Sequence, residues 1–379
     1  MLRPDIVAAG RLTIDLHKLV RNYEALGARV APARLAAVVK ANAYGLGATA
    51  VAEALETAGC RTFFVAHLSE ALSLRRGLAD HSEVFVLNGL APGSEALCAE
   101  MGCIPVLNSL EQVSSWNDLG LALGQTLPAA IQLDSGMVRL GLSEEDTRQV
   151  AAAPEALAGI DLRLVMSHLA CADNPAAEAN HRQRRRFDEM ANLLPPAPRS
   201  LSNSASALGP PAPHGDLVRA GIALYGGAAL RDTPNPMQPV VRLEAAIIQV
   251  RTVPDGAGVG YGLMYTTKGV RRLATVSVGY ADGWPRRLGG RGAVFVGGVR
   301  APIVGQVSMD SMTIDVTAAP ETALRPGAPV ELIGEHQSLE QVAADAGAIG
   351  YEILALLGPR YTRIYCEARP RDAVTGAKS

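Results

Sequence analysis

The chain has 379 residues, of which 48% are hydrophobic and 19% are charged. This composition suffices for a large buried core and excludes a chain that is disordered throughout. The 35 basic and 37 acidic side chains give a formal net charge of −2. Because nucleic-acid binding needs a basic surface, we expect no nucleic-acid partner.

The sequence also lacks the marks of membrane and secreted proteins. It has no run of about 18 uncharged apolar residues, and its first residues lack the apolar stretch of a signal peptide. Its five cysteines are odd in number and show no CxxC spacing, which argues against a disulfide framework and a zinc site. We therefore expect a cytoplasmic protein with reduced cysteines, no membrane contact and no metal.

The first 225 residues contain eight short β-rich runs, which alternate with helix-forming stretches such as Gly47–Ala58 and Asn180–Leu194. The runs are Leu35–Lys40, Thr62–His67, Glu83–Asn88, Ile104–Asn108, Ala130–Asp134, Leu162–His168, Ser200–Asn203 and Leu217–Tyr225. Eight apolar strands alternating with helices predict an α/β fold, a (β/α)8 barrel with its active site at the C-terminal strand ends.

The pattern changes at the proline-rich segment Asp232–Pro239. Beyond it, short strands punctuated by glycines follow one another without long helices, which predicts a mostly antiparallel β domain. We expect one helix over Leu339–Leu357 and a last strand over Tyr361–Cys366 in this part. The sequence therefore predicts a barrel domain over residues 1–235 and a β domain over residues 236–379.

Lys40 is one of only four lysines, and it closes the apolar run LAAVVK. Burial lowers the pKa of a lysine, and the neutral amine is the form that attacks carbonyl compounds. Tyr44, Gly45 and Gly47 follow in a glycine-rich turn, which leaves backbone N–H groups free for an anion. From the strand position alone, a lysine whose ammonium extends out of the barrel mouth is an equally good interpretation.

The last two strands of the predicted barrel offer groups for a phosphate. The segment SNSAS carries Asn203, Ser204 and Ser206, and LVRAGIALYG places Arg219 and Gly221 at the end of the eighth strand. The loop after strand eight is a recurrent phosphate site in barrels. A reactive lysine facing such a site indicates pyridoxal 5′-phosphate (PLP) as the cofactor.

The motifs VVKANAYGLG, SHLA, NSAS, RAGIALYG, VGYG, GYADG and VGQVSMDSM stand in the order found in the alanine racemases. The chain resembles that family from about residue 10 to residue 368. The resemblance implies a fold-type III PLP enzyme, an isomerase that interconverts L- and D-alanine. It also implies a head-to-tail homodimer with shared active sites, which serves peptidoglycan precursor supply or alanine catabolism.

The resemblance further implies a role for each matching residue. Lys40 corresponds to the lysine that holds PLP covalently and is the base on the D-alanine side, and Tyr261 to the base on the L-alanine side. The residues that correspond to the family's phosphate cradle are Tyr44, Ser204, Gly221, Ile222 and Tyr351, and Asn203 also belongs to the cofactor site. Arg139 corresponds to the ligand of the phenolic oxygen and contributes to substrate binding. Met309 and Asp310 from the partner chain correspond to the contacts of the substrate carboxylate, and Tyr280 to an entry-corridor residue.

His168 and Arg219 are expected to form a hydrogen-bonded chain that lowers the pKa of Tyr261, since a tyrosine is otherwise a poor base. A histidine at a strand end is more often structural, but the SHLA match favours the functional interpretation. Many PLP enzymes place a carboxylate against the ring nitrogen. An arginine cannot accept that proton, so the nitrogen is expected to stay unprotonated.

The sequence departs from the family at two positions. Many relatives have a lysine that can be carbamylated where this chain has Gln132, and Val138 replaces a commoner glycine. Gln132 cannot carry the carbamate that orients Arg139, so a bound anion such as chloride or a direct hydrogen bond is expected instead.

Three other functions remain to be weighed. A racemase of broader specificity, acting on serine or lysine, is the nearest alternative, although Tyr261, Tyr280 and Tyr351 are expected to crowd the pocket. A PLP decarboxylase of the same architecture normally has a carboxylate at the ring nitrogen and a cysteine in the second domain's site loop. A non-catalytic PLP-binding protein needs only the barrel.

Overall fold

The computed structural model describes residues 10–366, which form two compact units. One unit comprises Leu19–Gln238, and the other combines the residues up to Lys18 with those from Pro239 onward. We describe each unit by itself.

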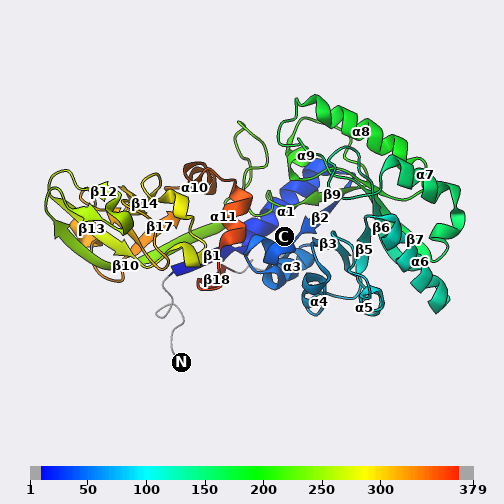
Figure 1. The fold of residues 1–379 in the computed structure, drawn as a ribbon, viewed down its shortest axis with the longest axis horizontal. Coiled ribbons are helices and arrows are strands. Elements are labelled where there is room, and N and C mark those ends of the chain that lie inside the picture. The colour runs from blue at the N-terminus through cyan, green and yellow to red at the C-terminus, as the bar shows by residue number, and fades with distance from the viewer. Residues whose placement is uncertain (1–9, 367–379) are drawn as a thin grey trace, which may run out of the picture. The chain divides into compact units, whose positions relative to one another are not determined.

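The first unit contains eight strands in one sheet, in the order β8-β7-β6-β5-β4-β3-β2-β9, and every neighbouring pair in that order is parallel (Figure 1). The strands are β2 (Arg34–Val38), β3 (Thr62–Val65), β4 (Glu83–Val86), β5 (Ile104–Leu107), β6 (Leu127–Gln132), β7 (Ile160–Met166), β8 (Arg199–Ser200) and β9 (Leu217–Ala220). A parallel bridge between Asn203 and Arg219 links the two ends of this order. The sheet is therefore a nearly closed barrel, as predicted.

Helix α1 (Leu16–Val30) precedes the first barrel strand, β2, and further helices connect successive strands, as a parallel sheet requires. These are α2 (Lys40–Tyr44), α3 (Ala48–Thr57), α4 (Leu68–Arg75), α5 (Glu95–Glu100), α6 (Leu110–Leu123), α7 (Glu144–Ala152), α8 (Glu178–Ala191) and α9 (Ser204–Leu208), with a 3₁₀ turn η2 (Pro154–Leu157). Buried strands supply the core, and all four residues of β3 are inaccessible to solvent. This core fixes where the strand ends, and the polar residues beyond them, are placed.

The strands end earlier than the sequence predicts. β2 stops at Val38 and β7 at Met166, so Lys40 and His168 lie just beyond their strands. At Lys40 the cause is local, because the backbone leaves the extended conformation at Val39 and turns left-handed from Ala41. Most functional candidates of the barrel thus lie just after the strands, where side chains can converge, whereas Arg219 lies on β9 itself.

The second unit is built on a largely antiparallel sheet, which confirms the predicted architecture. Its strands are β1 (Gly10–Asp15), β10 (Val241–Val253), β13 (Arg271–Val276), β14 (Ala293–Val296), β15 (Val299–Pro302), β16 (Met312–Asp315), β17 (Pro329–Ile333) and β18 (Thr362–Cys366). A separate hairpin pairs β11 (Gly258–Val259) with β12 (Tyr265–Thr266). Short 3₁₀ turns lie at η3 (Tyr261–Leu263), η4 (Tyr280–Asp282), η5 (Arg286–Leu288) and η6 (Glu321–Ala323).

Two expectations about this unit need correction. The barrel domain expected over residues 1–235 begins too early, because β1 pairs with β10 and β18 and so belongs to this sheet. The single helix expected over Leu339–Leu357 is two helices, α10 (Leu339–Ala346) and α11 (Gly350–Leu356). Gly347 ends α10 with a φ of 61°, a left-handed conformation that favours glycine and stops a helix.

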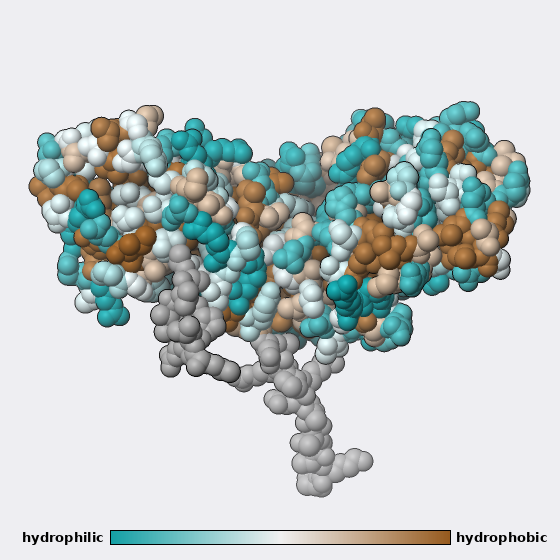
Figure 2. Space-filling model, turned by 60° about the horizontal axis from the view of Figure 1, so that its bottom comes forward, coloured by the Kyte–Doolittle hydropathy of each residue, from teal (hydrophilic) through white to brown (hydrophobic). Residues whose placement is uncertain are grey.

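Within residues 10–366, no helix is long and apolar enough to cross a membrane. The face drawn in Figure 2 has hydrophobic residues interspersed with hydrophilic ones on both units. Such a mixed face is ordinary for a protein surface that contacts water.

Candidate active site

Lys40 is followed by four residues in the left-handed conformation. The φ angles of Ala41, Asn42, Ala43 and Tyr44 lie between 52° and 55°. Each costs about 1–2 kcal/mol relative to a right-handed turn. Such a strained segment persists only where its surroundings fix it, and strain of this kind concentrates at functional sites. The turn therefore singles out Lys40 more sharply than its sequence does.

Several hydrogen bonds hold this turn. Ala43 N donates to Val39 O and Gly45 N to Ala41 O, both at 2.8 Å. Ala48 N donates to the Asn42 side-chain oxygen at 2.9 Å, which joins the turn to the start of α3. The direction in which the chain leaves Lys40 is thereby set by the backbone itself.

The electrostatic surroundings of Lys40 favour its neutral form. Burial lowers the pKa of the Lys40 ammonium, and the cations Arg139 and Arg219 lower it further. The carboxylate of Glu70 acts in the opposite direction. A half-buried lysine with a lowered pKa has the neutral amine that a nucleophile or a base needs.

Ser204, Gly221 and Tyr44 form a compact polar cluster beside this turn. The Ser204 hydroxyl accepts hydrogen bonds from Gly221 N at 2.8 Å and from Ala223 N at 3.4 Å, which leaves its own proton free to donate. A Cβ on Gly221 would collide with the Tyr44 hydroxyl, so only glycine allows this approach. The Tyr44 ring lies 4.8 Å from the ring of Tyr225. The hydroxyls of Tyr44 and Ser204 thus both lie close to the backbone of Gly221.

Asn203 and Ile222 lie next to this cluster but contribute differently. Asn203 caps α9, since its side-chain oxygen accepts from Ser206 N at 3.1 Å. Ile222 is fully buried directly after Gly221. Asn203 therefore has a demonstrated structural role in placing Ser204.

Arg219 is a buried cation at the centre of the barrel's polar residues. One of its terminal nitrogens donates to Ser200 O at 2.9 Å and to the Ser200 hydroxyl at 2.6 Å. The other donates to Ser167 O at 2.6 Å and lies 3.3 Å from His168 Nδ1. Burial lowers the pKa of Arg219 to about 10, which still leaves it charged near neutrality.

The contact with Arg219 defines the state of His168. Burial and the cations Arg219, Arg139 and Lys40 lower the pKa of His168 to about 3, so the imidazole is neutral at physiological pH. Arginine only donates, so Nδ1 must be the accepting nitrogen and the proton resides on Nε2. His168 thus presents an Nε2–H donor on its other side.

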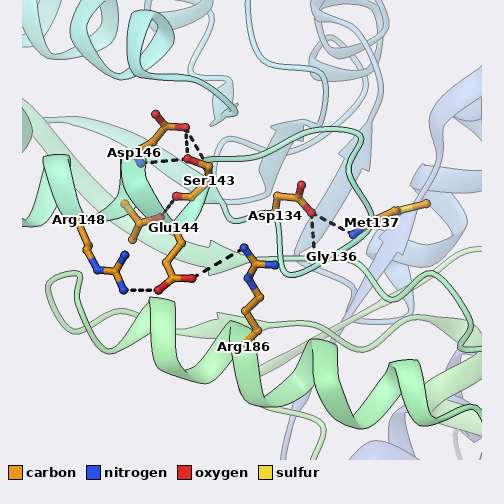
Figure 3. A network of polar contacts seen from close by, with 9 residues as sticks. Asp134, Gly136, Met137, Ser143, Glu144, Asp146, Arg148 and Arg186 are labelled. Carbon is orange, nitrogen blue, oxygen red and sulfur yellow. Dashed lines mark hydrogen bonds and ion pairs between the residues drawn. The ribbon is translucent and has the colours of Figure 1, made fainter.

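The loop that carries Arg139 is fixed at both ends (Figure 3). The Asp134 carboxylate accepts from the backbone N–H groups of Gly136, Met137 and Val138 at 2.9–3.0 Å. At the far end, Ser143 and Asp146 form a reciprocal cap on α7. The loop is therefore well defined, although Arg139 itself is exposed.

Gln132 and Arg139 border one small cavity together with His168. Gln132 is buried, and its side-chain amide makes no hydrogen bond within residues 10–366. The direct Gln132–Arg139 hydrogen bond that the sequence allowed is thus not formed in this structure.

The second unit brings Tyr280, Met309 and Asp310 together. Tyr280 N donates to Ser308 O at 3.0 Å, and Ala281 N donates to Met309 O at 2.9 Å. Tyr280 and Met309 have large exposed side chains. Tyr261, on η3, is 72% exposed, and Tyr351, on α11, is 37% exposed. These candidates therefore lie on the surface of their unit.

Two residues that contact candidate segments, one in each unit, were not identified from the sequence. Arg360 contacts Asp282 at 3.0 Å and Asp310 at 2.7 Å, and so ties the GYADG and SMD segments together. Glu70 accepts from the backbone of Ala41. For Arg360 no local signal exists, whereas Glu70 stands three residues after His67, which is the spacing of a capping box.

Comparison with known proteins agrees with this geometry. Residues 14–229 match the model of the alanine racemase N-terminal domain, and residues 240–365 match that of the alanine racemase C-terminal domain. A relative from Agrobacterium fabrum, named "Alanine racemase, catabolic", is 51% identical over 360 residues, which cover 95% of this chain and 93% of the relative. An alanine racemase from Brucella canis is 49% identical over 374 residues, covering 95% and 94% of the two chains.

A solved structure is also similar to this chain. The alanine racemase of Bartonella henselae, solved with covalently bound pyridoxal phosphate, superposes with a TM-score of 0.91 at 41% identity. The match covers 95% of this chain and all of the other. This chain belongs to the alanine racemase family.

Proposed function

We propose that this chain is a PLP-dependent alanine racemase in which Lys40 and Tyr261 are the two bases. The observation that carries the proposal is the convergence of Lys40, Tyr44, Ser204 and Arg219 at the C-terminal ends of the barrel strands. Family membership gives the reaction class, and the geometry of the barrel supports the choice of Lys40.

The residues present fit PLP. The hydroxyls of Tyr44 and Ser204 at the bare backbone of Gly221 suit a phosphate, and the lowered pKa of Lys40 suits covalent attachment. Arg219, which is buried, would face the ring nitrogen, and Arg139 would bind from the loop that borders the site. Bound PLP supplies an electron sink that makes the Cα proton of alanine acidic.

Racemisation requires that a proton leave one face of Cα and that another arrive on the opposite face. Lys40 Nζ takes or returns the proton on the D-alanine side, and the Tyr261 hydroxyl does so on the L-alanine side. The Nε2–H group of His168 is available to stabilise a deprotonated tyrosine, with Arg219 fixing its orientation. A neutral His168 held in this way can donate to the tyrosine oxygen without competing for its proton.

We further propose that Tyr261, Met309 and Asp310 act in the site of a partner chain, within a homodimer. The support is their exposure, because three neighbouring apolar side chains on and after η3, Tyr261, Leu263 and Met264, are each at least 65% exposed. Side chains of this kind gathered on one turn are typical of an interface.

The other functions fit less well. A decarboxylase would place a carboxylate where Arg219 stands, and Arg219 is held by Ser200, Ser167 and His168 with no carboxylate among these partners. A non-catalytic PLP-binding protein would need neither Tyr261 nor Met309. A racemase that accepts serine or lysine differs only in pocket size, so assays over several amino acids must separate it from an alanine racemase.

The cellular role follows from less specific observations. The relative named "Alanine racemase, catabolic" supports a role in alanine catabolism, and supply of D-alanine for peptidoglycan is the alternative. All five cysteines are free thiols, which supports a cytoplasmic location.

One experiment tests the proposed function. The purified protein with PLP is incubated with L-alanine, L-serine and L-lysine, and each D-enantiomer is measured by chiral chromatography. We expect D-alanine to form fastest by far, and borohydride reduction followed by peptide mapping to label Lys40. Faster racemisation of serine or lysine, or a label on another lysine, would contradict the proposal.

A further inference from the structure

Glu70 is the third residue of α4 and closes the capping box of that helix. Its Oε2 accepts hydrogen bonds from Ala66 N at 2.7 Å and from His67 N at 3.1 Å. These bonds satisfy the N–H groups where the chain leaves β3, which is the ordinary task of a carboxylate at this position.

The other oxygen of the same carboxylate has a different partner. Glu70 Oε1 accepts from Ala41 N at 2.6 Å, which is the residue directly after Lys40 and the first in the left-handed turn. One carboxylate thus receives three N–H donors from two loops that follow adjacent strands, β2 and β3. A charged acceptor makes each of these bonds stronger than a neutral one would be.

Glu70 also differs in charge from the other groups that act on Lys40. The charged groups that act on Lys40 from the elements around it are Arg139 after β6, Arg219 on β9 and Glu70 on α4, and His168 after β7 is neutral. Among these groups Glu70 alone is acidic. It opposes the two arginines and keeps the lysine protonatable.

We propose that Glu70 is a positioning residue for Lys40: its carboxylate fixes the left-handed turn and balances the arginines beside the lysine amine. This inference rests on the proposed role of Lys40 as the cofactor lysine and as a base. A negative charge near Lys40 helps it hold a proton after taking one from D-alanine, and the fixed turn keeps Nζ on one face of the substrate.

The lysine content of the chain allows a direct test. The chain has only Lys18, Lys40, Lys268 and Lys378, so labelling with [ε-¹³C]lysine gives four NMR signals from the holoenzyme. The Lys40 signal is assigned by its loss in Lys40→Arg. In Glu70→Gln, which keeps the shape and removes the charge, we expect that signal to move and the other three to stay. We also expect kcat to fall about tenfold or more with KM nearly unchanged.

Glu95→Gln is the matched control. Glu95 also lies in the first turn of a barrel helix, α5, and its carboxylate also accepts from a loop backbone group, Gly93 N at 2.8 Å, but it does not contact the Lys40 turn. We expect this variant to leave the Lys40 signal and kcat unchanged. If Glu70→Gln does not fold, Glu70→Asp takes its place. It keeps the charge but shortens the side chain, so we expect the Lys40 signal to move by a smaller amount than loss of the charge would cause.

The outcomes separate this inference from the proposed function. An unmoved Lys40 signal and full kcat in folded Glu70→Gln would overturn the role of Glu70, as would an equal shift in Glu95→Gln. If adding PLP moved the signal of a different lysine, the proposed function would fail first, whatever Glu70→Gln does.

Discussion

The barrel and the β unit present their candidate residues in opposite ways. In the barrel, Arg219 is buried and bonded to Ser200 and Ser167, and Ser204 is bonded to the backbone of Gly221. In the β unit, Tyr261 and Met309 are 72% and 53% exposed. In the proposed function, the barrel holds most of the groups that bind the cofactor, whereas the exposed groups of the β unit act on another surface. Proton transfer on two faces of the substrate would then require both.

Removal of Lys40 tests the barrel half most severely. In Lys40→Ala the covalent attachment of PLP and the base on the D-alanine side are lost together. We expect no visible absorbance from covalently bound cofactor and a loss of activity of at least about 10³-fold. Absorbance spectroscopy and the D-alanine assay measure these effects. Lys268→Ala should retain both, and an active Lys40→Ala enzyme would refute the assignment.

Mixing two inactive variants tests whether the β unit serves another chain. Lys40→Ala lacks the barrel lysine, and Tyr261→Phe lacks the hydroxyl of the β unit. If the sites are shared, random subunit exchange gives hybrid dimers with one intact site, and activity should recover to about a quarter of the wild-type value. Native mass spectrometry confirms that exchange occurred. No recovery in exchanged dimers would mean that each site draws on one chain.

Substitution of Gly221 tests whether PLP binding depends on the close approach of the Tyr44 hydroxyl to the backbone at this position. In Gly221→Ala the added Cβ meets the Tyr44 hydroxyl, so Tyr44 must move away from residue 221. We expect PLP to bind about ten- to a hundredfold more weakly, the usual cost of overfilling a packed site. Equilibrium titration with PLP measures this change. Gly27→Ala, where a Cβ meets nothing within 4 Å, is the control and should bind PLP normally.

The smallest expected effect concerns acid stability. The pKa of His168 is lowered to about 3 in the fold, while an unfolded histidine titrates near its ordinary value of 6.5. The unfolded chain therefore binds more protons between these values, so the stability conferred by neutral His168 is present above pH 6.5 and lost as the pH falls toward 3.

The variant His168→Gln removes this proton uptake. We expect the midpoint of acid unfolding, followed by circular dichroism, to move about half a pH unit lower. His17→Gln should leave the midpoint where it is. A wild-type protein that proves as acid-resistant as His168→Gln would mean that His168 is charged in the fold.

The sequence predicts the barrel, the β unit and most of the candidate residues, because strand periodicity and short motifs are local properties. It misplaces β1, because pairing with β10 joins residues more than 200 positions apart. It does not reveal the left-handed turn after Lys40, because the turn contains no glycine, the residue whose presence usually indicates that conformation. Arg360 and the bond from Ala41 to Glu70 depend on loops that only the fold brings together.

Solvent-deuterium exchange in Tyr261→Phe tests the two-base assignment most directly. Lys40 can still take the Cα proton of D-alanine in this variant and return a deuteron to the same face, while no group remains to take the proton of L-alanine. We expect racemisation to fall by about 10²–10⁴-fold in both directions. Deuterium should nonetheless enter Cα of D-alanine faster than Cα of L-alanine, as followed by proton NMR, with Tyr265→Phe behaving like the wild type. Equal exchange from both enantiomers, or faster exchange from L-alanine, would contradict the assignment.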